Sequence, residues 1–395
     1  STIAAVSESG GYATTYDITV AADATLAANN TISIASANAI DASGNAGLGS
    51  TISFTLPTTT TLKLATSTKD LSAVSLNAAV DTIDFNGVAA VLTISQTGLT
   101  LVASGGSYGI KDIANNMVNT DGSGLDSAVQ STTNVTVTDA ATVAQFDTLN
   151  AATTSAIVLA GGVSDVAASY AAANGTTTSG LTAIAAQDGD AVLTVTDAAT
   201  VAQFETLDAA TSSAIVLAGG ISDTAANLAP SGTKTSGFTA ASTQDTDVAV
   251  TITGTDPSVA EFNAIAAATS GVVSASISDN ISNLGSIVAA ATDAITVTVT
   301  DAVSVAQFNT LDAKTSVDIV LTGGVSDVAA SYAAANGTTT SGLTAIAAQD
   351  PNAVLTVTDA ATVAQFDTLN AATTSAIVLT GGVSDVAASY AAANG

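Results

Sequence analysis

The feature that most constrains this chain is an internal repeat. Residues 139–175 recur as residues 359–395 with a single substitution, and residues 163–188 recur unchanged as residues 325–350. Segments of the type Thr-Val-Thr-Asp end at successive steps of 58, 59, 45 and 58 residues, and segments of the type Val-Ser-Asp or Ile-Ser-Asp alternate with them. Self-similarity at such periods is typical of proteins that stack one small folded unit many times. We therefore expect a repeat protein.

Each long repeat divides into two half-units with the same internal order. A half-unit begins with a run rich in Val, Ile and Thr, such as residues 134–138 or 156–159, which has the composition of a strand. An Asp follows, and then an Ala-rich stretch in which Val143, Phe146 and Leu149 are three apart, as on one face of a helix. Gly or Asn-Gly ends the half-unit. The pattern predicts successive strand–helix (βα) units.

Consecutive βα units of this length require parallel strands, with each helix crossing back on one side of the sheet. We predict an α/β solenoid of parallel-strand βα units over residues 134–395, continuing beyond residue 395. A β-helix (β-solenoid) is the competing architecture, but a spacing of three residues fits a strand poorly. Residues 58–133 are predicted to be a linker and divergent first turns that cap the solenoid, because repeat proteins need capped ends.

Residues 1–57 follow a different pattern. Alternating runs at 16–20, 31–34 and 51–56 are separated by turn residues, which predicts a β-sandwich. The stretch Asp41-Ala-Ser-Gly-Asn-Ala-Gly resembles a turn of bacterial immunoglobulin-like modules, which occur in tandem on secreted surface proteins. The resemblance implies an immunoglobulin-like module at 1–57. Because the strands are too few for a complete domain, we expect a partial, truncated sandwich.

Composition excludes many functions. The chain has 395 residues with 33 acidic and 5 basic side chains, all five of them Lys, and its net charge is −28. It contains no Arg, His, Cys or Trp, so imidazole bases, thiolate nucleophiles and the usual zinc and haem sites are excluded. So few cations cannot neutralise a phosphate backbone, and we expect no nucleic-acid binding. No apolar run approaches the roughly 20 residues of a membrane span. We expect a protein that is not an enzyme.

The Asp residues that follow the strand runs are the one group that merits weighing as a site. In a solenoid they would align along one rim. We expect each to be the N-cap of the helix that follows it, because Asp is a preferred N-cap. Rows of carboxylate oxygens also suit Ca²⁺, which makes calcium the candidate cofactor. The candidate ligands are Asp139, Asp165, Asp197, Asp223, Asp256, Asp279, Asp301, Asp327, Asp359 and Asp385, with Asp41 in a second candidate site for which an ordinary Asx turn is the alternative.

From Asp139 onward the sequence resembles the tandem repeats of very large bacterial cell-surface proteins, notably those of marine cyanobacteria. The shared phrases are Val-Thr-Asp-Ala-Ala-Thr-Val-Ala-Gln-Phe and Ser-Asp-Thr-Ala-Ala-Asn-Leu, the latter at residues 222–228. The resemblance covers about residues 62–395. It implies an extracellular, surface-layer-like protein without catalytic residues. Proteins of that kind form surface layers, sheaths or fibres, act as adhesins, or support surface motility.

These observations lead to one principal hypothesis and two alternatives. We expect a structural protein of the cell surface that forms a surface layer, sheath or extracellular fibre through repeated, equivalent contacts with copies of itself. The cell envelope or its glycans are further candidate partners. The first alternative is the stalk or spacer of a large secreted adhesin. The second is an ice-binding surface built from Thr-x-Thr pairs, although Thr is also simply a good strand former; these pairs are Thr136/Thr138, Thr194/Thr196 and Thr298/Thr300.

Overall fold

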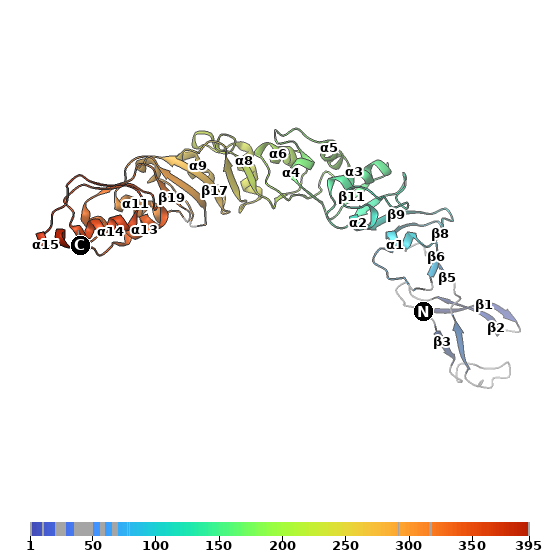
Figure 1. Ribbon diagram of the computed structural model, residues 1–395. Helices are drawn as coiled ribbons and strands as arrows, with labels where there is room; N and C mark the ends of the chain where they lie inside the picture. Colours follow the sequence, from blue (N-terminus) through green and yellow to red (C-terminus); the bar gives the residue numbers. More distant parts are fainter. Residues whose placement is uncertain are drawn as a thin grey trace. The chain divides into compact units, whose positions relative to one another are not determined.

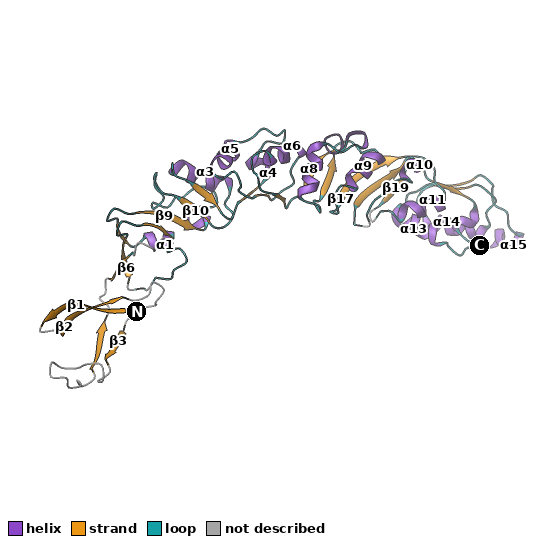
Figure 2. Ribbon diagram, turned by 180° about the vertical axis from the view of Figure 1, so that it is seen from behind, coloured by secondary structure: helices purple, strands orange, loops and turns teal. Residues whose placement is uncertain are grey.

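The computed structural model describes residues 2–9, 12–19, 29–34, 50–55, 60–64, 70–76, 78, 80–290, 292–315 and 318–393. The chain divides into two compact units, residues 1–161 and 162–395. In both units short parallel strands alternate with helices (Figures 1 and 2). None of the sheets formed by the described residues closes into a barrel.

The first unit begins with two antiparallel strand pairs. They overlap the strands predicted at 16–20, 31–34 and 51–56. The packing of their faces and the predicted site at Asp41 lie outside the described residues. The pairs are β1 (Thr2–Ser9) with β2 (Tyr12–Thr19), and β3 (Asn29–Ile34) with β4 (Ser50–Thr55).

The rest of the first unit is parallel. Residues 107–117 form a strand followed by a four-residue helix, as the Val-Ser-Asp segments do. One sheet contains β5 (Thr60–Lys63), β6 (Val80–Asp84) and β8 (Thr100–Val102), and the other contains β7 (Ala89–Leu92), β9 (Ser107–Asp112), β10 (Val135–Val137) and β11 (Ile157–Leu159). The helices are α1 (Ile94–Thr97), α2 (Ala114–Met117) and α3 (Val143–Ala152).

The second unit contains three parallel sheets. The first holds β12 (Val163–Asp165), β13 (Leu193–Val195) and β14 (Ile215–Leu217). The second holds β15 (Ile221–Thr224), β16 (Val250–Thr253), β17 (Val273–Asp279), β18 (Ala294–Val299) and β19 (Ile319–Leu321). The third holds β20 (Val325–Asp327), β21 (Leu355–Val357) and β22 (Ile377–Leu379).

Helices separate most of these strands, so the βα prediction is confirmed and the pure β-helix is wrong. The stripe predicted from a spacing of three is buried: Val143, Phe146 and Leu149 are all in the core. None of the described helices combines the length and apolar character that a membrane crossing requires. The helices of the second unit are α4 (Ala167–Tyr170), α5 (Ser179–Gln187), α6 (Val201–Asp208), α7 (Ala225–Leu228), η2 (Pro230–Gly232), α8 (Ser236–Gln244), α9 (Val259–Ala266), α10 (Ile281–Leu284), α11 (Val305–Asp312), α12 (Ala329–Tyr332), α13 (Ser341–Gln349), α14 (Val363–Ala372) and α15 (Ala387–Ala393).

Gly-Gly pairs mark where the chain leaves one sheet and enters the next. Between β14 and β15, a Cβ on Gly219 would lie 2.0 Å from the carbonyl carbon of Asp197, and Gly220 has a φ of +76°. Only Gly tolerates the close approach and the left-handed backbone. The short third repeat has no such pair, and its strand β17 runs unbroken for seven residues and pairs with both β16 and β18. The second sheet therefore has five strands where the others in this unit have three.

Candidate functional site

The first row of predicted site residues caps helices of the preceding half-unit. Asp139, Asp197, Asp301 and Asp359 follow strands β10, β13, β18 and β21. The Oδ1 of each accepts the backbone N–H of the first residue of a four-residue helix 20 to 30 residues earlier. These N–H groups have no partner within their own helices. The donors are Ala114, Ala167 and Ala329, each at 2.6 Å, and Ile281 at 2.8 Å.

The second row makes a similar contact to the longer helices. Asp223, Asp327 and Asp385 each accept, through Oδ2, the N–H of the first residue of a helix 22 residues earlier. Through Oδ1 each also accepts the N–H of its own next residue. Asp165 and Asp279 make that second bond as well. The long-range donors are Val201 at 3.0 Å, Val305 at 3.1 Å and Val363 at 3.1 Å; Asp112, absent from the predicted set, accepts from Ile94 at 2.9 Å in the same way.

The prediction that each Asp is the N-cap of its own helix is wrong. The five helices that start with Val, namely α3, α6, α9, α11 and α14, begin one residue after a Ser or Thr whose hydroxyl accepts the N–H of a Gln or Glu three residues on. This capping box satisfies the helix start locally and leaves the preceding Asp to reach the neighbouring half-unit. Where an Asp precedes a short helix, it stands one residue before the N-cap position. The observed N-caps of these five helices are Thr142, Thr200, Ser258, Ser304 and Thr362. The nine-residue helices α5, α8 and α13 are capped by Thr178, Thr235 and Thr340.

Asp256 does not belong to the first row. Strand β16 aligns with the other repeats so that Gly254 takes the place of Asp197, and Asp256 stands two residues further on, exposed. The corresponding short helix α7 compensates at its own N-cap, because the hydroxyl of Thr224 accepts the N–H of Asn227. Helices α4 and α12, which receive an Asp from the next half-unit, have Val at that position. Helices α2, α4, α7 and α12 are thus capped once, by their own N-cap residue or by a neighbour, whereas α1 and α10 have both kinds of cap.

The calcium hypothesis stays a prediction, and the structure shows only how the row carboxylates are grouped in the described part of the chain. No three carboxylates there come together in a group that could hold a metal ion. Backbone N–H groups point at the row oxygens, and their positive ends favour an anion and oppose a cation at the same place. The chemistry of these Asp residues is therefore structural capping. For Asp41 the structure describes nothing.

Few cations balance the carboxylates. Within the described ranges one ion pair occurs, Lys111 Nζ to Asp70 Oδ2 at 3.1 Å, and both side chains are exposed. Backbone N–H groups take over part of that role: those of Val386 and Val363, with the Ser389 hydroxyl, hold the pKa of Asp385 below its usual value. Three aromatic side chains that recur in the repeats, Phe146, Tyr170 and Phe204, are fully buried in the core. Burial raises the pKa of the Tyr170 hydroxyl.

Side chains of Gln and Asp occupy sheet edges, a feature that sequence reasoning missed. At the outer edge of β19, the N–H of Ile319 donates to Gln349 Oε1 at 3.1 Å and that of Leu321 donates to Asp350 Oδ2 at 2.8 Å. Gln244 receives the N–H of Ile215 on β14 in the same way. The Gln-Asp pair that recurs at the end of α5, α8 and α13 was the available signal. Because these side chains stand in for carbonyls of a further strand, the sheet stops there.

The Thr-x-Thr pairs do not form a regular threonine array. Thr136 lies between Lys111 and Val158 across its sheet. Thr194 lies between Ser164 and Val216. The outward rows therefore mix Ser, Thr and Val, and the array that the ice-binding hypothesis needs is interrupted on every side.

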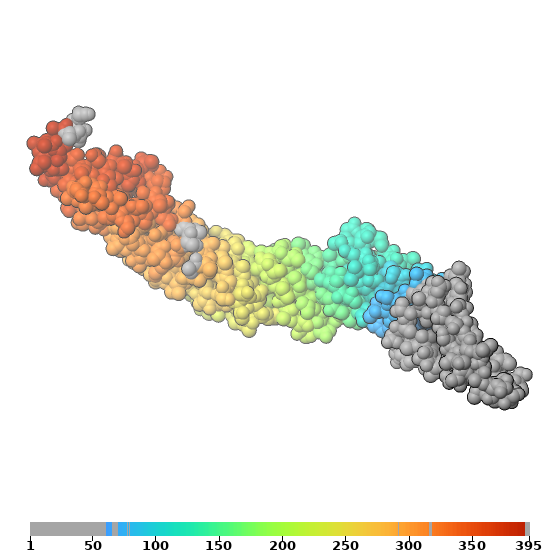
Figure 3. All heavy atoms as spheres, turned by 90° about the horizontal axis from the view of Figure 1, so that it is seen from below, coloured from blue at the N-terminus to red at the C-terminus, as the bar shows by residue number. Residues whose placement is uncertain are grey.

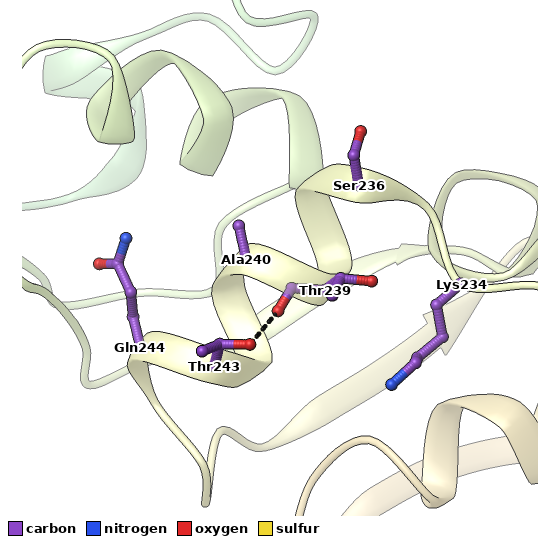
Figure 4. Close-up of a pocket in the computed structure, with 6 residues that line it drawn as sticks. All are labelled: Lys234, Ser236, Thr239, Ala240, Thr243 and Gln244. Carbon is purple, nitrogen blue, oxygen red and sulfur yellow. Dashed lines mark hydrogen bonds between the residues drawn. The ribbon is translucent and has the colours of Figure 1, made fainter.

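The hollows on the surface are shallow. One of about 650 Å³ is lined by residues of α8 and its approach, including Lys234, Ser236 and Gln244 (Figure 4). Its side chains diverge, with Ser236 and Lys234 pointing to opposite sides. The space-filling view shows no deep opening over the described part of residues 162–395 on the side drawn (Figure 3). We identify no convergent set of polar groups that would hold a small ligand.

Comparison with known proteins gives no relative. No family model, curated protein or solved structure matches this chain.

Proposed function

We propose that this chain is a non-enzymatic structural protein of the bacterial cell surface, part of a surface layer, sheath or extracellular fibre. Its units would stack as an α/β solenoid, and repeated, equivalent surfaces would contact copies of the chain. The surface hollows are shallow, and the carboxylates serve as caps that join neighbouring half-units. Both observations fit a structural protein.

The observation that supports this proposal is that equivalent contacts join neighbouring half-units of the repeat. Ala167 to Asp197 and Ala329 to Asp359 have the same 2.6 Å distance in two copies of the repeat. The amide of Gln203 donates to the carbonyl of Ala171 at 2.8 Å, and the equivalent Gln365 donates to Ala333 at 2.7 Å. Identical junctions give identical outer surfaces at fixed intervals, which is what a regular assembly requires.

Electron microscopy of native envelopes, with an antibody against residues 162–395, tests the proposal. A lattice, sheath or ordered fibre that carries the label supports it. Isolated flexible rods that end in a separate head would favour the adhesin stalk instead, and label inside the cell would refute a surface function.

A further inference from the structure

We propose that the outward faces of the two three-stranded sheets in the second unit are self-association surfaces. Each packs against the same face of a second copy of this chain. This inference rests on the proposed function and names the surface and partner that it requires. We call the surface the sheet face; in the first sheet of the second unit it consists of Gly162, Ser164, Val192, Thr194, Thr196, Ala214 and Val216, and in the third sheet of Gly324, Ser326, Val354, Thr356, Thr358, Ala376 and Val378.

The alternation of side chains along the strands defines this face. Leu193 and Val195 are buried under the helices, whereas Thr194 between them points outward. Valine side chains on the face are unusually exposed for their type: 43% for Val192, 44% for Val216, 38% for Val354 and 43% for Val378. Helices cover the opposite side of each sheet. Apart from Gly162 and Gly324, which are buried, the sheet face is therefore an apolar and hydroxyl surface that nothing in the described chain covers.

The absence of charge on the sheet face allows a second copy of this negatively charged chain to bind there. The chain has a net charge of −28, so most surfaces of two copies repel each other. The residues that make up the sheet face include no ionisable side chain. The alternation along β12 and β20 places Asp165 and Asp327 on the opposite side, with the buried Val163 and Val325. Two copies can thus meet face to face without bringing carboxylates into the contact, where desolvating them would be costly.

The shape of the sheet face is self-complementary, because low and high columns of side chains lie on neighbouring strands. Gly162 sits beside Val192, and a Cβ on Gly162 would lie 2.4 Å from the Val192 carbonyl oxygen, so this column of the face is necessarily low. Gly324 repeats the arrangement beside Val354 at 2.6 Å. The columns of Val192 with Thr194, and of Ala214 with Val216, stand higher. A copy related by a two-fold axis along the central strand would place its Ala214–Val216 column over the Gly162–Ser164 column, as the inner faces of packed sheets interdigitate.

Sedimentation velocity of the whole 395-residue chain tests the inference. We expect the weight-average sedimentation coefficient to rise between about 1 μM and about 500 μM protein, a range that detects micromolar to sub-millimolar association. The rise should be larger in about 1 M NaCl, where the Debye length of about 3 Å screens the repulsion. A chain that stays monomeric throughout would overturn the inference.

Matched variants locate the contact. The double variant Val216→Glu, Val378→Glu puts a carboxylate on two sheet faces, and association should weaken at least about tenfold. The control Ala186→Glu, Ala348→Glu adds the same charge at exposed positions of α5 and α13, and should associate like the wild type apart from a small general repulsion. Circular dichroism melting checks that both fold. Equal weakening in the two variants, or none in the first, would refute the sheet face as the contact.

The conservative pair Val216→Thr, Val378→Thr keeps strand propensity and shape, and we expect an intermediate loss of association. Unchanged association would refute the role of the valine columns. Adsorption of a monomeric wild type to ice or to crystalline polysaccharide would also overturn self-association. A labelled lattice on cells together with a monomeric chain in solution would leave the proposed function standing and remove only this surface.

Discussion

The backbone N–H of Ala329, the first residue of helix α12, donates to Oδ1 of Asp359 at 2.6 Å, across 30 residues of sequence. Ala167 and Asp197 make the same contact in another copy of the repeat. An acidic side chain of one half-unit thus completes a helix of the half-unit before it. Most Asp residues of the two rows lie at such junctions, where a carboxylate meets the positive end of a helix.

Removing one of these junctions should destabilise the fold. We expect Asp197→Ala to lower the free energy of unfolding by about 1–2 kcal/mol, because the first N–H of α4 loses its acceptor and its N-cap residue Val166 offers no substitute. Urea unfolding followed by circular dichroism measures the loss. The matched control is Asp256→Ala, an exposed Asp outside the rows, which should change stability by less than about 0.5 kcal/mol. Equal effects would contradict the capping role.

The first Gly of each Gly-Gly pair should resist substitution. We expect Gly219→Ala to cost about 3 kcal/mol or more, because its Cβ would meet the backbone of Asp197 at 2.0 Å and neither strand can move independently. Gly98→Ala is the control, since that Gly has a φ of −68° and its Cβ would meet Ser95 O at 3.4 Å. Thermal melting of both variants checks the prediction, and a melting temperature for Gly219→Ala within error of that for Gly98→Ala would count against it.

The third residue of the helices that start with Val should be Gln where the neighbouring segment presents a carbonyl, and can be Glu where it presents an N–H. Gln203 donates to the buried carbonyl of Ala171 at 2.8 Å, so Gln203→Glu would place two oxygens face to face. We expect a loss of roughly 1–3 kcal/mol at pH 7. Repulsion raises the pKa of this carboxyl in the folded state, so the deficit should shrink as the pH falls towards 4 and the carboxyl regains a proton to donate. Urea unfolding at the two pH values measures this.

A natural counterpart provides the control for that prediction. Glu261 occupies the same helical position in the third repeat, where its Oε1 accepts the N–H of Ser231 at 3.2 Å. Glu261→Gln retains an acceptor, so we expect a smaller loss at pH 7. Hydrogen bonds from Ser258 hold the pKa of Glu261 below its usual value, so this smaller difference fades at low pH because the wild type itself loses the stabilising carboxylate. A Gln203→Glu deficit that does not depend on pH would show that its cause is packing and not the lost donor.

Asp385 should titrate below an ordinary Asp. Its carboxylate accepts the N–H groups of Val386 and Val363, and these bonds lower its pKa in the folded state. Because the folded pKa lies below the unfolded one, the stabilising contribution is complete above about pH 4 and is lost as the pH falls through the folded value. Carboxyl ¹³C NMR titration measures the midpoint. A midpoint at or above about 3.9 would contradict these hydrogen bonds.

Local patterns were read correctly wherever the cause is local. The three-residue spacing of Val143, Phe146 and Leu149 produces one buried stripe in any helix, and strand composition at 134–138 identified β10. The helix starts were misread because Asp and Thr are both good caps and lie three residues apart. The capping box with Gln145 favours Thr142, and only the position of the neighbouring helix shows what Asp139 does instead.

The sequence by itself determined the period, the alternation of strand and helix, the parallel sense of the strands and the aromatic core, because each follows from propensity, spacing and short connections. Tertiary structure decided which half-unit each side chain serves. Asp359 reaches back 30 residues, Gln349 covers the edge of β19 across 30 residues, and Gly219 admits the backbone of Asp197. Such partners meet only when distant segments of the chain fold together, and the sequence period does not show which neighbour a hydrogen bond or close contact joins.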